Sequence, residues 1–139
     1  MPRNVTAIMP DRAEPTLPAI SDAERAALLL DELRNGFVLL DEAVTELADI
    51  DSWGGLALFL AGRVELHPDT VRGAIEAPSD ELVMALCRAT GLSSNGFSAV
   101  LRMRRRRHRD AGNSLAEALA RFHALPPETA QRRLRGGEG

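Results

Sequence analysis

The sequence predicts an all-α fold: a compact array of about seven or eight short helices, HEAT-like or bundle-like in its packing. Apolar residues recur at helical spacing along most of the chain, and helix-capping and helix-stopping residues separate them at short intervals. We find no alternating run of strand length. A chain of 139 residues, 45% of them hydrophobic, is large enough for one apolar core and too short for two.

Each expected helix has a local start or stop signal. The first begins with a capping box, in which Ser21 can accept from a free N–H and Glu24 can reach back, and Asn35-Gly36 ends it. Asp51 or Ser52 can cap the third. The expected helices cover about 21–35, 38–49, 52–61, 68 onward with proline at the first position, 79–90, 93 through the arginine run, 115–124 and 127–135.

The chain divides into one helical domain and two short flanks. Residues 1–20 hold half of the 8 prolines, and proline removes a backbone donor and disfavours helix in its predecessor, so we expect a flexible tail. Residues 21–135 form the domain, and 136–139 a flexible end. Residues 1–20 hold no apolar run of signal-peptide length, and no apolar run in the chain approaches the length of a membrane-spanning helix, so the sequence predicts a cytoplasmic protein with no membrane partner.

Helical spacing also predicts the core. Cys87 lies on the apolar side of its helix, and as the single cysteine it excludes a disulfide framework and a Cys-based zinc site. Trp53 is either a buried plug at a helix start or an exposed anchor for a partner, and burial is the commoner state. The expected core residues are Leu30, Leu33, Leu40, Val44, Leu47, Leu60, Val71, Ile75, Leu82, Leu86, Phe97, Val100, Leu101 and Leu119.

An internal repeat supports the helical prediction. Residues 56–70, LALFLAGRVELHPDT, align with residues 115–129, LAEALARFHALPPET. Each segment reads as a helix, a leucine plug and then a proline-initiated helix with an acid in its first turn, where the helix dipole favours it. Repeated helix pairs that share a core are typical of HEAT-like stacking, although an Ala/Leu-rich composition can produce such a match by coincidence.

Two segments carry a resemblance to a known family. GRVELHPDTVRGAIEAPSDELVMALCRATGLSSNGFSAVLRMRRRR and the closing LARFHALPPETAQRRLR resemble the C-terminal part of a bacterial family of domains of unknown function. The longer members of that family look like HEAT-type helical repeats, and this chain lacks their long N-terminal repeat region. The resemblance covers about Leu29 to Arg135. It implies a helical regulatory or interaction module and brings no substrate, cofactor or catalytic residue.

Charge is unevenly distributed along the chain. Residues 1–101 carry 7 arginines and 16 acids, a net −9, whereas residues 102–139 carry 10 arginines and 4 acids, a net +6. Six arginines at the end of the sixth helix cannot share one face, so we expect a basic collar there. The collar is either a solvated end that pairs with the acidic half or a site for an anionic partner. The candidate partner- or anion-binding residues are Arg102, Arg104, Arg105, Arg106, Arg107 and Arg109.

Residues 82–101, LVMALCRATGLSSNGFSAVL, also have the spacing of a helix-turn-helix with Gly91 in the turn. The second helix would then read DNA bases while the arginine run binds phosphates. Gly96 inside that helix, the lack of an arginine or glutamine at its start, and the net charge of −3 count against this alternative. The candidate base-reading residues are Ser94, Asn95 and Ser98.

No catalytic constellation is visible in the sequence. His67, His108 and His123 lack the spacing of a metal site, and the paired carboxylates suit helix caps and helix surfaces. We therefore expect no enzyme, no metal and no cofactor. The sequence predicts a non-enzymatic helical protein-interaction or regulatory module, with an acidic protein surface as its partner and a DNA-binding regulator as the alternative. Partner identity and oligomeric state stay open.

Overall fold

The structure, a computed structural model, describes residues 20–108 and 114–138 and confirms the all-α prediction. Within those ranges the chain forms eight helices and no strand. The expected tail, apart from its last residue, lies outside the described residues. The last helix continues through 136–138, three residues past the expected end of the domain. The helices are α1 (Asp22–Arg34), α2 (Leu40–Asp49), α3 (Trp53–Val64), α4 (Pro68–Glu76), α5 (Glu81–Thr90), α6 (Ser94–Arg107), α7 (Leu115–Ala124) and α8 (Pro127–Glu138).

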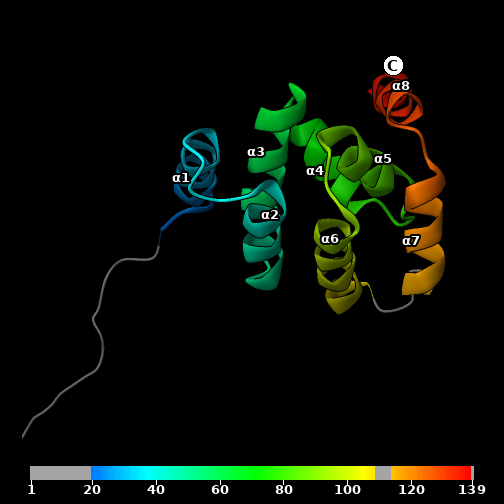
Figure 1. Cartoon of the computed structure of the whole chain (residues 1–139), viewed down its shortest axis with the longest axis horizontal. Coiled ribbons are helices and arrows are strands. Elements are labelled where there is room, and N and C mark those ends of the chain that lie inside the picture. The colour runs from blue at the N-terminus through cyan, green and yellow to red at the C-terminus, as the bar shows by residue number, and fades with distance from the viewer. Residues whose placement is uncertain (1–19, 109–113, 139) are drawn as a thin grey trace, which may run out of the picture.

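The helices form an array with α1 at one end and α8 at the other (Figure 1). Between them, α3 packs against α1 and α4, α2 packs against α6, α6 packs against α7, and α5 packs against α8. The two aligned segments of the sequence repeat therefore share a helix–loop–helix outline but differ in packing. Helix α4 lies against its own neighbour α3, whereas α8 lies chiefly against α5.

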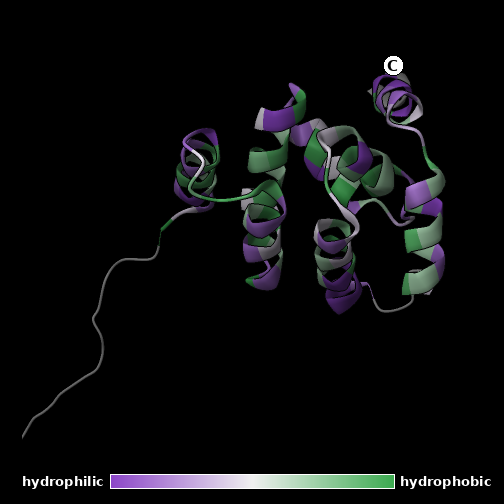
Figure 2. Ribbon diagram, viewed as in Figure 1, coloured by the Kyte–Doolittle hydropathy of each residue, from purple (hydrophilic) through white to green (hydrophobic). Residues whose placement is uncertain are grey.

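The core follows the apolar faces that the sequence predicts (Figure 2). Trp53 and Cys87 are both buried, and Phe97 stacks on Phe122 with ring centroids 4.4 Å apart. Leu82 was expected in the core, and this prediction is wrong, because Leu82 is 37% exposed and faces a groove between α4, α5 and α8. The other expected core residues are fully buried, except for four that are partly buried and pack against the core: Leu30, Leu33, Leu40 and Leu119.

One helix starts where its capping residues predict, and another starts later because of a tertiary contact. The capping box of α1 is complete, with Ser21 Oγ accepting from the Glu24 N–H and the Glu24 carboxylate accepting from the Ser21 N–H. Helix α5 begins at Glu81 rather than at Pro78–Ser79. Asp80 occupies its N-cap position, but its carboxylate makes no cap bond because it accepts from Arg104 instead. A side chain of α6 thus determines how α5 begins.

Candidate functional site

Helix α6 carries the arginine run, and the structure turns its most central member inward. Arg104 is fully buried (0% exposed) although it lies in the arginine-rich last turn of its helix. Its guanidinium donates to Asp80 and to the backbone carbonyls of Ile75, Ala77 and Ser79. Those carbonyls belong to the end of α4 and the loop that follows it. Because the guanidinium of arginine offers five N–H donors in a fixed fork, this one side chain can hydrogen-bond all three carbonyls as well as Asp80.

Two further arginines also bind within the chain. Arg106 Nε donates to Asp51 at 3.0 Å and its Nη2 donates to the Ala48 carbonyl, which holds the turn between α2 and α3. Asp51 in that turn has a φ of +56°, a left-handed conformation that a non-glycine residue rarely adopts. The Arg107 guanidinium lies 4.0 Å from the ring centroid of Trp53, in cation–π geometry. These arginines tie α6 to the first half of the chain.

The structure does not gather the six candidate arginines into one outward surface. Arg102 is exposed and has no ion pair within the described residues. Arg105 is partly buried and lies 3.5 Å from Asp80. Arg109 lies outside the described residues. The end of α6 is hydrophilic (Figure 2), yet much of its charge is matched by Asp51, Glu76 and Asp80 of the acidic half.

The candidate helix-turn-helix has the expected backbone at its turn, where Gly91 ends α5 with a φ of +89°. The two helices, however, have different main partners, because α6 packs against α2 and α5 packs against α8. Asn95 is exposed, whereas Ser94 and Ser98 are only partly so. The three candidate base-reading side chains are therefore not presented together on a free helix face.

An acidic residue occupies the start of α6. The Asp41 carboxylate of α2 accepts from both the N–H and the hydroxyl of Ser93. A Cβ at Gly96 would lie 2.7 Å from Asp41 Oδ1, so this glycine lets α2 approach α6 closely. Further acids of α2, including Glu42, line the shallow hollow beside Asn95. The acidic side chains of α2 therefore lie beside the start of α6, where a DNA duplex would have to bind.

The apolar corner between α1 and α2 is the surface that sequence reasoning missed. The Phe37 N–H donates to the Glu32 carbonyl and the Gly36 N–H to the Leu33 carbonyl, which closes α1 in a Schellman turn. In this turn Phe37 points outward, 80% exposed, and Leu39 at the N-cap of α2 is 68% exposed. We call Phe37 and Leu39 the apolar corner. The sequence did contain a sign of this surface: residue 39, at the N-cap position of a helix, is leucine, whereas Ser, Thr, Asp or Asn is usual there.

The described residues contain no group of three or more His, Cys, Asp or Glu side chains that could hold a metal ion. Burial raises the pKa of the Cys87 thiol well above its usual range, although the charge of Arg104 opposes this. The thiol is therefore protonated and a poor nucleophile at neutral pH.

Across the described ranges, every helix is too short or too polar to cross a bilayer.

Together these features define a small all-helical array whose arginine-rich helix is anchored within its own fold. The chain belongs to the family described as "Uncharacterised protein conserved in bacteria (DUF2336)", which it matches over residues 2–135. Comparison with curated proteins and with solved structures gave no significant match.

Proposed function

We propose that this chain is a non-enzymatic helical module that works in the bacterial cytoplasm and binds another protein through the apolar corner. The observation that carries the proposal is the exposure of Phe37 and Leu39, two large apolar side chains two residues apart in the short connection between α1 and α2. Single exposed leucines are ordinary on protein surfaces. An aromatic and an aliphatic residue that are both more than half exposed in one short connection fit an anchor for a partner.

The position of Leu39 strengthens this interpretation. Its backbone has the extended conformation of an N-cap residue, and its N–H already donates to the Glu42 carboxylate at 2.8 Å. Only a side-chain oxygen at residue 39 is missing from a full capping box. Serine there would stabilise α2 by about 1 kcal/mol. Leucine at this position is exposed and makes the helix less stable than serine would. This fits a functional role, because residues at binding surfaces are commonly not the most stabilising ones.

The alternative of a DNA-binding regulator has weaker physical support. Arg104, Arg106 and Arg107 already have partners inside the chain, so neutralising phosphates would require breaking those contacts. Asp41 and its acidic neighbours on α2 would repel a duplex at the start of α6. The same contacts leave fewer arginines for an acidic protein surface, which is why we place the partner at the apolar corner.

The test compares capture of proteins from a bacterial lysate by immobilised wild-type chain and by Phe37→Ser and Leu39→Ser variants. Leu115→Ser is the matched control, since Leu115 is an exposed leucine at the start of α7, far along the chain from the corner. We expect a captured protein to be lost from both corner variants and retained by the control. Equal capture by all four proteins would refute the corner as the binding surface.

Duplex binding is measured in parallel by fluorescence anisotropy at about 0.15 M salt. Arg102→Ala is the informative variant, because removing Arg104 would damage the fold. We expect no micromolar binding. Tight duplex binding that weakens in Arg102→Ala would promote the DNA-binding alternative.

A further inference from the structure

We propose that the partner of the apolar corner is a second copy of this chain, bound head to tail, with the corner of one copy seated in a groove at the α8 end of the next. This rests on the proposed function and names its partner. The groove consists of two hollows that share one wall. Leu66, in the α3–α4 connection, and Leu134 of α8 line both hollows.

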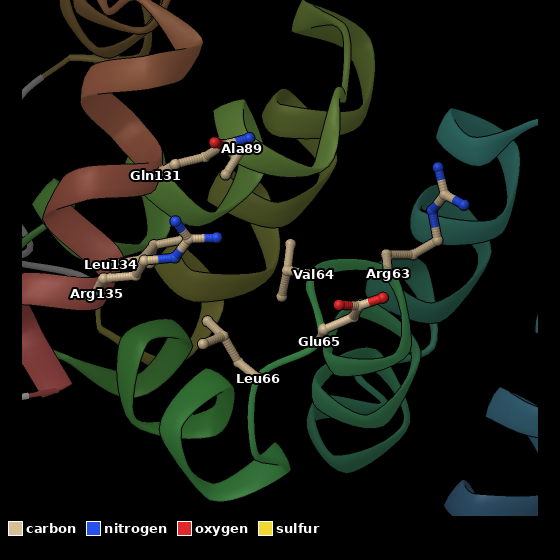
Figure 3. Close-up of a pocket in the computed structure, with 8 residues that line it drawn as sticks. All are labelled: Arg63, Val64, Glu65, Leu66, Ala89, Gln131, Leu134 and Arg135. Atoms are coloured by element: carbon tan, nitrogen blue, oxygen red, sulfur yellow. The ribbon is translucent and has the colours of Figure 1, made fainter.

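The first hollow lies where the end of α3 meets α5 and α8. Figure 3 shows Leu134 and Arg135 on one side of it and Val64 and Leu66 on the other, with Ala89 above. Its volume is about 190 Å³. A cavity of about 150 Å³ is large enough to hold benzene, so a phenyl ring the size of that of Phe37 fits by volume. The lining of this hollow exposes more polar than apolar surface.

The second hollow continues from the first between α4, α5 and α8 and has a volume of about 410 Å³. Its lining is slightly more apolar than polar, and Leu82 is exposed to it. Gly73 opens onto it, since a Cβ at this residue would meet nothing within 4 Å. The residues that line it are Leu66, Asp69, Thr70, Val71, Gly73, Ala74, Leu82, Leu86 and Leu134.

The apolar corner has the shape that two adjacent hollows require. Phe37 and Leu39 are exposed, while Val38 between them is half-buried and packs against the core. The corner therefore offers two apolar knobs separated by a short gap, and the groove offers two hollows separated by a shared wall.

Charge also matches between the two surfaces. One acid is fixed at the corner, because the Glu42 carboxylate accepts from the Leu39 N–H. At the first hollow, the guanidinium of Arg135 reaches toward the cavity, whereas that of Arg63 points away from it, and Glu65 is the one acid in the lining (Figure 3). Within the described part of the chain, neither arginine has a carboxylate partner.

The two surfaces differ: the corner joins α1 to α2, whereas the groove is lined by the end of α3 and by α4, α5 and α8 (Figure 1). A contact between them is heterologous, so it leaves one free corner and one free groove and produces rings or open chains. A face-to-face contact between two corners would instead stop at a dimer. This difference provides the test.

The experiment is sedimentation velocity on the full chain from about micromolar to about millimolar concentration, with four proteins. They are the wild type, Phe37→Ser, Gly73→Trp and Gly73→Ala. Tryptophan at 73 fills the second hollow, whereas alanine adds a methyl group to open space and is the matched control. We expect the wild type and Gly73→Ala to associate beyond the 15.1 kDa monomer and the other two variants to associate about tenfold more weakly.

Mixing the two weakened variants completes the test. Phe37→Ser keeps an intact groove and Gly73→Trp keeps an intact corner, so the mixture should form a heterodimer and nothing larger. Undiminished association of Gly73→Trp would overturn the head-to-tail contact in favour of corner against corner. A wild type that stays monomeric throughout would overturn self-association altogether, while the lysate capture would still decide separately whether the corner binds a different protein.

Discussion

Arg104 of α6 reaches Asp80 at the start of α5 with two nitrogens at once: Nε and Nη2 both donate to Oδ1, at 3.2 and 2.9 Å. Asp80 is itself buried, and the remaining donors of Arg104 point at backbone carbonyls. This pair joins two helices that hardly meet otherwise. Arg104 is therefore part of the core, although its place in an arginine run predicts a solvent-exposed side chain.

Replacing Arg104 should cost the protein much of its stability. Arg104→Met removes both charged donors to Asp80 Oδ1 and leaves that buried carboxylate with Arg105 alone, 3.5 Å away. Breaking one side of a buried pair typically costs about 3–5 kcal/mol. Arg102→Met, on the exposed side of the same helix, should change stability by less than about 0.5 kcal/mol. Urea unfolding followed by circular dichroism measures both. Equal midpoints for the two variants would contradict the burial of Arg104.

The contact between Arg107 and Trp53 gives a spectroscopic prediction. Trp53 is the single tryptophan, so the fluorescence of the chain reports on its surroundings alone. Arg107→Ala should shift Trp53 emission and lower the free energy of unfolding by about 0.5–2 kcal/mol, the usual strength of a cation–π contact. An unchanged emission spectrum would show that the guanidinium does not stack on the indole. Arg102→Ala is the control.

Leu39→Ser should raise stability, which is an unusual direction for a substitution. Serine at this N-cap can accept from the first turn of α2 and so complete the capping box with Glu42, a gain of about 0.5–2 kcal/mol. Phe37→Ser should stay within about 0.5 kcal/mol of wild type, because Phe37 makes few contacts in the fold. Thermal unfolding of both variants checks this. A loss of stability in Leu39→Ser would mean that the leucine supports the fold and is not reserved for a partner.

Cys87 should resist thiol reagents in the native state. It is fully buried, and burial raises the pKa of its thiol, so little thiolate is present at neutral pH. Labelling should become fast only when urea unfolds the chain. Cys87→Ala should lower stability by about 1 kcal/mol, as for small deletions in a packed interior, and leave association unchanged. Rapid labelling of folded protein would contradict this prediction.

The capping box of α1 predicts a pH effect. The backbone and hydroxyl of Ser21 hydrogen-bond the Glu24 carboxylate and lower its pKa. A lowered folded-state pKa contributes stability above the unfolded value, and this contribution is lost as the pH falls through the folded value. In an NMR titration, Ser21→Ala should raise the pKa of Glu24 part of the way toward its ordinary value, because the backbone N–H of residue 21 still donates to the carboxylate. No upward movement would show that the Ser21 hydroxyl does not bind Glu24 in solution.

The candidate sites show which information a sequence lacks. The arginine run and the helix-turn-helix spacing were both visible in the sequence, but spacing along a helix does not reveal which neighbour lies against it. Asp80 and Asp41 are distant in sequence from Arg104 and Gly96, and only the packing of α6 against its neighbours brings them together. Phe37 was hidden for the same reason, since a phenylalanine beside a helix stop is compatible with either core or surface.

The sequence by itself determined the helices, because capping boxes, prolines and glycines act within one turn of where they stand. Ser21 with Glu24, Pro68 and Gly91 each mark a helix end that the structure shows. The tertiary structure alone decided that Arg104 is buried, that Leu82 is not, and that Phe37 remains outside. Burial is a property of the whole arrangement: a side chain leaves water only where other elements cover it and match its polar groups. No local pattern in the sequence specifies those elements.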